Sequence, residues 1–154
     1  MQRATILLAP LLSLSLLMFA PRSVANAAPP CDTVEQGTYV DNLRGSADEA
    51  SRAGRHARAM NLFAKAADYQ AACAPVETRN TRQRASAQGN DYDPSSAFYS
   101  GPMTTYIDAA REALKAGLRR ERCLYARRSR IMQLHTDARR EAPDSEMRTL
   151  LKGC

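Results

Sequence analysis

Tryptophan is absent from the sequence, and aromatic residues together make up only 6% of its 154 residues. Strands favour aromatic and β-branched residues, whereas alanine and arginine, both abundant here, favour helices. A chain of this length is one domain's worth of residues and can bury one modest core. The composition therefore predicts a single all-α domain, which we expect to contain about five helices.

The sequence also lacks the motifs of hydrolases and of metal sites. Neither G-x-S-x-G nor H-E-x-x-H occurs, and the two histidines, His56 and His135, are far apart. No C-x-x-C pair or Cys/His cluster could hold a structural metal. The stretch that starts at Asp91 resembles the beginning of a calcium loop, but Ser96 and Pro102 stand where glycine and glutamate are needed. We therefore expect no enzyme activity, no metal and no cofactor.

Long apolar runs are confined to residues 1–27, which have the three parts of a secretory signal peptide. Arg3 supplies a positive charge, an apolar stretch runs from Ile6 to Ala20, and Ala25-Asn26-Ala27 is an A-x-A cleavage site. A proline interrupts the apolar stretch, which is shorter than the roughly 20 residues of a membrane span. We expect cleavage after residue 27, a periplasmic or secreted mature chain, and no membrane span in residues 28–154.

The charges are distributed unevenly along the chain, whose formal net charge is +6. Residues 28–101 carry 8 basic and 9 acidic side chains, whereas residues 102–154 carry 12 and 7. Because opposite charges attract, an anionic partner would prefer the C-terminal half.

Four cysteines are present, and an even number in an exported chain indicates two disulfides, for which three pairings exist. Cys31 and Cys73 lie at similar distances from Gly54, the expected turn of a hairpin. At 1.5 Å per residue these distances along the helices are roughly 34 and 28 Å. The match favours a Cys31–Cys73 bridge, which leaves Cys123 and Cys154 as the second pair.

Residues 32–74 are expected to form a helical hairpin with its turn at Gly54. Asp32 and Glu35 together are a helix-start signature, and Pro75 is expected to end the second helix. Apolar residues recur at intervals of three and four on both sides of the turn, which predicts a buried stripe on each helix. The two stripes consist of Val40, Leu43, Ala47 and Ala50, and of Ala59, Met60, Phe63, Ala66, Ala67, Gln70 and Cys73.

The segment after this hairpin, residues 76–102, is polar at first and then rich in turn-forming residues. Residues 76–88 are expected to form a short helix, and residues 89–102 a long loop. A loop of this length is usually functional or disordered, and its aromatic residues favour the first interpretation. These aromatic residues either cap the core between two hairpins or present a contact surface; they are Tyr92, Phe98 and Tyr99.

A second hairpin is expected over residues 103–141, with Thr104 or Thr105 as its N-cap and Gly117 at its turn. Its second helix is expected to run from about residue 118 to residue 140. The residues expected to face the core are Tyr106, Ala109, Ala110, Ala113 and Leu114, followed by Leu124, Tyr125, Ile131, Met132 and His135.

A short helix is expected at the C-terminal end, over residues 144–152. Pro143 would separate it from the preceding helix, and Asp144 or Ser145 would begin it. The last cysteine would then fold back against the preceding helix, as the second disulfide requires.

Residues 40–69 have the pattern of two helices that touch through small side chains. Gly54 lies at the turn, while Leu43 and Phe63 flank the contact. The small residues are Ala47, Ala50, Ala59 and Ala66. This pattern resembles the tetratricopeptide repeat, a unit of about 34 residues with two antiparallel helices, and His56 stands where that family usually has tyrosine. A weaker second copy lies near residues 103–130, where Arg122 replaces an expected small residue.

The resemblance implies stacked hairpins whose first helices line a concave groove for a protein or peptide. An irregular helical bundle is the alternative architecture. In the repeat-like arrangement, solvent-facing residues of the first helices would carry recognition. These candidates are Arg44, Asp48, Arg52, Asp108 and Arg111. For each of them, an ordinary solvated helix face is the alternative interpretation.

An arginine-rich segment follows in the fourth expected helix. Arg119, Arg122 and Arg130 share one helix face with Ala126 and could form a basic stripe. Arginine forks match carboxylate and phosphate groups, so anionic lipid or polysaccharide of the cell envelope are possible partners. The segment has no interleaved aromatic residues, and we expect no nucleic acid as a partner. Arg128 lies nearer the apolar face and is expected to pair with an acid from another helix.

The sequence thus predicts an exported, disulfide-stapled helical module that binds another protein or a peptide in the periplasm or outside the cell. One alternative is a basic surface binder of anionic lipid or polysaccharide. Another is a small helical hydrolase or its inhibitor, for which no set of residues is visible.

Overall fold

The computed structural model describes residues 28–154, so the signal peptide predicted for residues 1–27 lies outside the described part. Residues 28–154 form five α-helices and one short 3-10 helix, η1, without a strand, which confirms the predicted all-α class. The elements are α1 (Val34–Arg52), α2 (His56–Ala87), α3 (Ser95–Lys115), α4 (Arg119–Gln133), η1 (Asp137–Arg140) and α5 (Ser145–Leu151).

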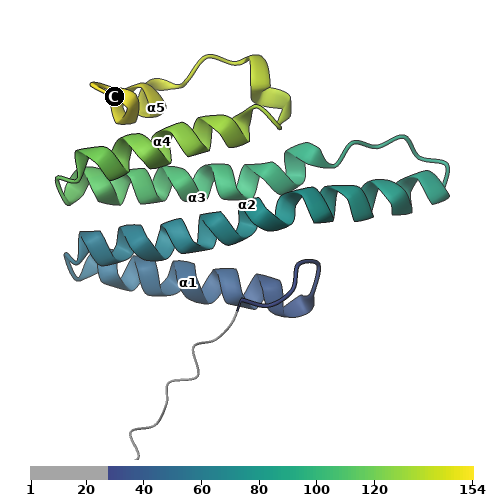
Figure 1. Ribbon diagram of the computed structural model, residues 1–154, viewed down its shortest axis with the longest axis horizontal. Helices are drawn as coiled ribbons and strands as arrows, with labels where there is room; N and C mark the ends of the chain where they lie inside the picture. Colours follow the sequence, from purple (N-terminus) through teal and green to yellow (C-terminus); the bar gives the residue numbers. More distant parts are fainter. Residues whose placement is uncertain (1–27) are drawn as a thin grey trace, which may run out of the picture.

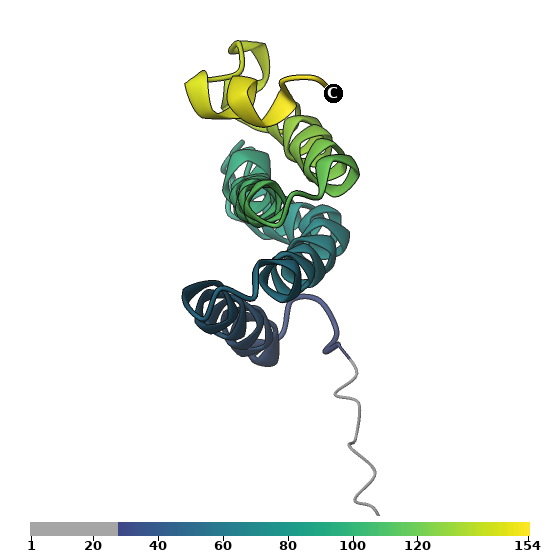
Figure 2. The same ribbon diagram turned by 90° about the vertical axis from the view of Figure 1, so that its left-hand side faces the viewer.

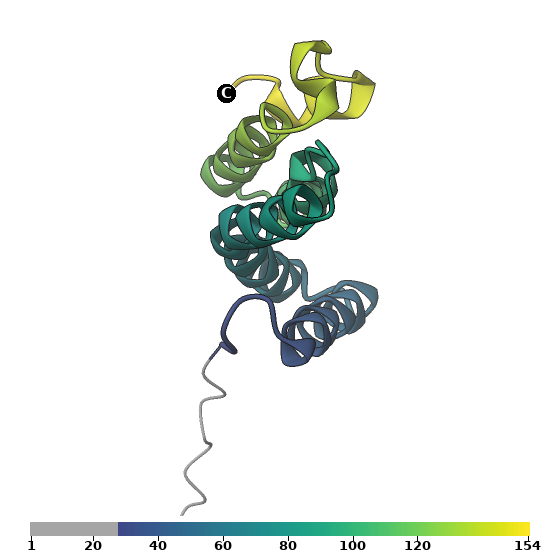
Figure 3. The same cartoon turned by 90° about the vertical axis from the view of Figure 1, so that its right-hand side faces the viewer.

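Successive helices run antiparallel and stack one above the other in chain order (Figure 1). Seen end-on, the stack is a zigzag: α1, α3 and α5 lie on one side, and α2 and α4 lie on the other (Figures 2 and 3). The most extensive contacts join α2 to α3, followed by α3 to α4 and α1 to α2. Each long helix therefore packs mainly on its neighbours in sequence, as in two consecutive hairpins.

Small residues form the contact between α1 and α2, as the sequence predicts. Ala47 and Ala50 of α1 and Ala59 and Ala66 of α2 are almost completely buried. Phe63 of α2 packs in one cluster with alanines of α1 and α3, so this aromatic ring joins three helices. The two helices can approach closely because alanine places only a methyl group between the backbones. Gly54, with a φ of +70°, supplies the turn between them.

The core of the second half is built from α3, α4 and α5. Ala110, Ala126, Met147 and Leu150 form a buried cluster, against which Tyr125 packs. The predicted core residues of α3 are buried except Leu114, which is 45% exposed. On α4 the expectation was wrong for three more residues. Leu124 and Ile131 are exposed, and so is His135, which follows the helix.

The physical reason is the position of α4 in the stack. Its buried side is narrow, and within the described part only Ala126 and Ser129 are fully covered on it. Ser129 donates a hydrogen bond to the carbonyl oxygen of Met103 at 2.9 Å, which fixes this side against α3. No further long helix of residues 28–154 covers the outer side of α4 (Figure 1), so apolar residues there stay in contact with water.

Pro75 does not end the second helix, contrary to the expectation. α2 continues through it for three more turns, to Ala87, and includes the segment expected as a separate short helix. Proline costs a helix one backbone hydrogen bond, here the one to the carbonyl of Ala71. Contacts beyond the proline offset this cost. Gln36 of α1 donates to Glu77 at 2.5 Å, and Arg82 of the extension pairs with Asp93, just before α3, at 2.8 Å.

The long loop expected over residues 89–102 is also wrong, because α3 begins at Ser95 and runs through Pro102. Asp93 accepts hydrogen bonds from the backbone N and the hydroxyl of Ser95, at 3.1 and 2.6 Å, and these bonds support the first turn of the helix. Pro94 and Pro102 are both fully buried. Burial of the two prolines, rather than helix propensity, stabilises this part of α3.

The two predicted disulfides are present. Cys31 is bonded to Cys73 with a Cα–Cα distance of 5.2 Å, and Cys123 to Cys154 with one of 5.5 Å. The first bridge fastens the segment before α1 to the middle of α2. The second fastens the residues after α5 to α4. Both ends of the described chain are therefore linked covalently to long helices.

Two helix ends differ from the expectation, and a third agrees with it. The N-cap of α1 is Thr33, and the side chain of Asp32 accepts a bond from Asn80 of α2 at 3.0 Å instead of capping α1. The fourth helix ends at Gln133, about seven residues earlier than expected. The predicted start of α5 is confirmed, since Asp144 accepts a bond from the backbone N of Met147 at 2.7 Å.

Candidate functional site

A cavity of about 230 Å³ opens between α1 and α3, on the side of the stack that α1, α3 and α5 share. We call it the α1/α3 groove. Its walls come from the two first helices of the hairpins, and its floor comes from α2. The lining residues are Arg44, Asp48, Ser51, Phe63, Asp108, Arg111, Glu112 and Lys115. Four of the five predicted recognition residues are therefore brought together, although about 60 positions separate the two helices in sequence.

Helical periodicity explains this convergence. Arg44, Asp48 and Ser51 follow one another on α1 at intervals of four and three, so they share one face. Asp108 and Lys115 do the same on α3 at an interval of seven. The alanine contacts that hold both helices against α2 turn these two faces toward one another.

The floor of the groove is rigid. Phe63 is 5% exposed and packs against Ala47 and Ala109, one residue from each wall. A ligand in the groove would therefore meet an aromatic ring below and charged side chains at both sides. This combination suits a polypeptide segment, because a side chain can contact the ring while the charges engage its neighbours.

Glu112 is the most constrained charged residue of the groove and was not among the predicted site residues. Its side chain is almost fully buried and accepts three hydrogen bonds, from Ser51 Oγ at 3.0 Å, His56 Nδ1 at 2.8 Å and Lys115 Nζ at 2.6 Å. Burial alone would raise the pKa of this carboxyl, but the bonds from Lys115, His56 and Ser51 outweigh burial and hold its pKa below the ordinary value.

A sequence signal for Glu112 does exist. It lies within the alanine-rich stripe of α3, beside Ala109 and Ala113, where an acid must be buried. A buried acid requires partners, and His56 at the start of α2 is one of them. In the sequence, His56 stands where the tetratricopeptide repeat usually has tyrosine, and the structure gives its ring a specific polar contact with Glu112.

Arg111, a predicted recognition residue, is occupied by intramolecular bonds. Its guanidinium donates to both carboxylate oxygens of Glu146 in α5, one of them at 2.6 Å, and to Asp108 at 2.7 Å. The bond from Arg111 lowers the pKa of Glu146. Arg111 therefore braces α3 against α5 at the upper edge of the groove.

Asp108 is half-buried beside this arginine. Burial raises its pKa, while the nearby cations Arg111 and Arg44 act in the opposite direction without cancelling the effect. A further cation brought into the groove would stabilise the ionised form. The carboxylate of Asp108 can therefore receive a positively charged group of a ligand.

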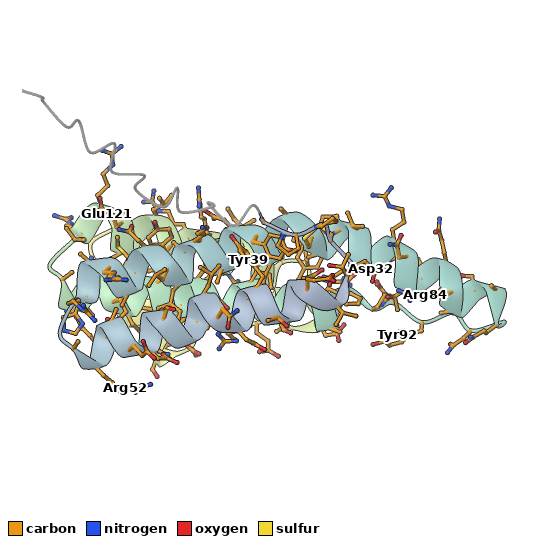
Figure 4. The ribbon with its side chains drawn as sticks, turned by 90° about the horizontal axis from the view of Figure 1, so that it is seen from below. Asp32, Tyr39, Arg52, Arg84, Tyr92 and Glu121 are labelled. Carbon is orange, nitrogen blue, oxygen red and sulfur yellow. A yellow bond between two sulfur atoms is a disulfide. The ribbon has the colours of Figure 1, made fainter. Side chains whose placement is uncertain are left out.

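Arg44 and Asp48 are the groove residues with uncommitted charges. Neither makes an ion pair or a side-chain hydrogen bond with any group in residues 28–154. They project from adjacent turns of α1, and they offer one positive and one negative group to a ligand. Arg52, the fifth predicted residue, does not line the groove; it lies exposed in the last turn of α1 (Figure 4).

The arginines of α4 do not form a free basic stripe. Arg119 donates to the carbonyl oxygen of Gly153, and Arg122 donates to that of Lys152 at 2.7 Å. Arg130 donates to Gln133 within its own helix. Arg119 and Arg122 hold the residues after α5 in place beside the second disulfide, because the carbonyl groups at a helix C-terminus need donors.

Arg128, by contrast, behaves as predicted. It pairs with Asp68 of α2 at 2.7 Å, and the same carboxylate oxygen accepts a bond from the hydroxyl of Tyr106 at 2.6 Å. This contact joins α2, α3 and α4 on the side of the stack opposite the groove.

The three aromatic residues expected in a loop are separated in the structure. Tyr92 is 51% exposed in the short connection before α3, beside the projecting part of α2 (Figure 4). Phe98 and Tyr99 are half-buried in the first turns of α3, and the ring of Tyr99 stacks on that of His135 at a centroid distance of 4.4 Å. They form no common contact surface.

Among residues 28–154, no three His, Cys, Asp or Glu side chains are grouped so that they could hold a metal ion. In the same part of the chain, no helix combines the length and the apolar character that crossing a membrane requires. Comparison of the chain with family models, with curated proteins and with solved structures gives no match.

Proposed function

We propose that the chain is an exported helical module that binds a segment of another protein in the α1/α3 groove. One observation carries the proposal. Arg44 and Asp48 of α1 and Asp108 of α3 were selected from sequence as recognition residues, and they line a single cavity with an aromatic floor. Two of these three side chains have no partner within residues 28–154, so their charges are available to a ligand.

We propose that the resemblance to tetratricopeptide repeats extends to the arrangement of the helices. α1 and α2, and then α3 and α4, form consecutive antiparallel hairpins that touch through alanine, and the first helices lie on the same side (Figure 2). In repeat proteins of this kind, such a side is the concave binding surface. We propose that the chain uses this side in the same way.

Export is supported by the two disulfides, which persist in oxidising compartments such as the periplasm or the extracellular space. The signal-peptide pattern of residues 1–27 points in the same direction. We place the mature protein in the periplasm or outside the cell.

The dimensions of the groove limit what it holds. Pockets for drug-sized molecules have volumes of about 300–1,000 Å³, and 230 Å³ is below that range. One large side chain of a partner fills such a space, with its flanking residues along the walls. Because the walls offer both signs of charge, we expect the partner segment to carry charged residues beside an apolar one. Asp108 and Asp48 would receive a cation, and Arg44 an anion.

A pull-down from cell-envelope extract with two matched double variants tests this function. Arg44→Ser with Asp48→Asn removes one charge of each sign from the groove. Glu49→Gln with Arg58→Ser removes one of each sign from exposed positions outside it. We expect the native protein and the control variant to retain the same partner in quantitative mass spectrometry, and the groove variant to lose it. Equal retention by both variants would reject the groove as the binding site.

A further inference from the structure

A second cavity lies at the other end of the stack and takes no part in the proposed protein-binding groove. It begins on the part of α2 that continues beyond Pro75 and projects past α1 (Figures 1 and 4). Five residues of this extension recur at intervals of three, four, seven and eight, so they share one helix face. This face consists of Pro75, Thr78, Arg79, Arg82 and Gln83.

The cavity has a volume of about 350 Å³, within the range of small-molecule sites. The face of α2 forms one wall. Ser95 and Tyr99 of α3 and His135, two residues after the end of α4, form the other. The rings of Tyr99 and His135 are nearly parallel, with an angle of 19° and a centroid distance of 4.4 Å. α4 stops at Gln133, so it leaves this face of α2 open.

The charge of the cavity is positive. Arg79 makes no ion pair or hydrogen bond with the side chains that the structure describes. Arg82 donates through Nη2 to Asp93 at 2.8 Å, which holds its guanidinium in one position. A guanidinium has five N–H groups, and this ion pair uses one of them. The cavity therefore presents Arg79, which is unpaired, and Arg82, whose guanidinium is held in place and still has N–H groups to donate.

Thr78 adds an independent observation. It is 9% exposed, and its hydroxyl oxygen is one of two buried side-chain polar atoms without a hydrogen-bond partner in residues 28–154. Buried polar groups are nearly always satisfied, so such an atom in the wall of a cavity calls for a partner from a ligand or a water molecule. A buried hydroxyl without a hydrogen bond costs free energy, and proteins seldom leave this cost uncompensated.

We propose that this cavity binds a small molecule that bears a carboxylate or phosphate group. Arg79 and Arg82 receive the oxyanion, since arginine forks match both groups in shape and charge. Thr78 and Gln83 bond to polar atoms beside it. The stacked rings of Tyr99 and His135 cover the uncharged body of the ligand.

Titration calorimetry with three probes tests the site: glucose 6-phosphate, glucuronate and glucose. They share a sugar body and differ in the phosphate, the carboxylate or the absence of charge. We expect one or both anions to bind saturably with a Kd of about 1 mM or tighter, and glucose not to bind. The anion that binds identifies the preferred group. Failure of both anions to saturate, or equal binding of glucose, would overturn the proposal.

Two variants on the same helix make the test specific. Arg79→Ser removes the unpaired cation, and we expect it to weaken anion binding about tenfold or more. Arg84→Ser removes an exposed arginine that lies 3.6 Å from Asp32 and does not line the cavity, so it should bind as the native protein does. Circular dichroism verifies that both variants fold. In the native protein, binding should also shift the ring proton resonances of His135. Equal affinity of the two variants would show that the anion binds elsewhere.

Discussion

His56 Nδ1 lies 2.8 Å from Glu112 Oε2 and thereby ties the first turn of α2 to the last turn of α3. The same carboxylate accepts a bond from Ser51, near the end of α1. Three helices are thus joined by one buried acid at an edge of the α1/α3 groove. The spacing between the groove walls depends on this junction, because α1 and α3 have few other direct contacts.

Replacing Glu112 by glutamine should therefore destabilise the protein. The amide cannot accept charge-assisted bonds from Lys115 and His56 as a carboxylate does. These partners are 52% and 30% exposed, so water takes over part of their solvation. We expect a loss of about 1–3 kcal/mol in the free energy of unfolding, measured by urea titration. Glu121→Gln, on α4, is the control and should change it by about 0.5 kcal/mol or less. Equal effects of both variants would contradict the junction.

The lowered pKa of Glu112 also leads to a prediction of how the free energy of unfolding depends on pH. The pKa of Glu112 is lower in the folded state than its ordinary value of 4.5, so the folded protein binds fewer protons than the unfolded chain. The stabilisation is therefore complete above about pH 4.5 and is lost as the pH falls through the folded pKa. Glu146 acts in the same direction and Asp108 in the opposite one. The difference in unfolding free energy between native protein and Glu112→Gln isolates Glu112. It should shrink below pH 4.5, and a constant difference would be inconsistent with a lowered pKa.

Removing either disulfide should lower the free energy of unfolding, and the two removals should differ in their local effects. The bridges close separations of 42 and 31 residues, and the chain-entropy relation gives about 4 kcal/mol for each as an upper value. Replacing Cys31 and Cys73 by serine should lower the free energy of unfolding by about 2–4 kcal/mol. Replacing Cys123 and Cys154 should in addition expose the amides of α5 to hydrogen exchange, because this helix has only seven residues. Peptide mapping of the unreduced protein that showed Cys31 linked to Cys123 would refute both pairings.

The two helix-internal prolines should respond differently to substitution by alanine. Pro75 is exposed, and alanine would restore the N–H that can bond to the carbonyl of Ala71. We expect Pro75→Ala to raise the unfolding free energy by about 1–2 kcal/mol, part of the ~3 kcal/mol that separates the two residues in a helix. Pro102 is fully buried, and its truncation leaves a cavity that offsets the gain. Pro102→Ala should therefore be no more stable than the native protein in the same titration. A gain as large as that of Pro75→Ala would contradict the role given to burial.

Local pattern was sufficient to predict the turns of the two hairpins, at Gly54 and Gly117, and the cysteine pairs. Ala47, Ala59 and Ala66 recur at helical spacing, and their burial follows from it. The similar distances of Cys31 and Cys73 from Gly54 predicted the first bridge because a straight antiparallel hairpin converts sequence separation into distance. The same periodicity placed Arg44 and Asp108 on the faces that line the groove.

Two features of the structure depend on tertiary contacts and could not be predicted from local sequence pattern. A proline in sequence predicts a break, but Pro75 and Pro102 lie inside helices because packing between α2 and α3 outweighs one lost hydrogen bond at each. The bonding of Arg119 and Arg122 to the residues after α5 depends on how the end of the chain folds back. Helical spacing alone could not show this, since it describes one helix and not its neighbour.

The most direct test of the central claim is site-specific photocross-linking in living cells, with a benzophenone amino acid at one position of α1 at a time. Position 48 lies in the groove, and position 49 is exposed on a different face of the same helix. We expect a discrete cross-linked product with one protein from position 48, abolished by Arg44→Ser, and none from position 49. The same product from both positions, or none from position 48, would contradict a protein-binding groove between α1 and α3.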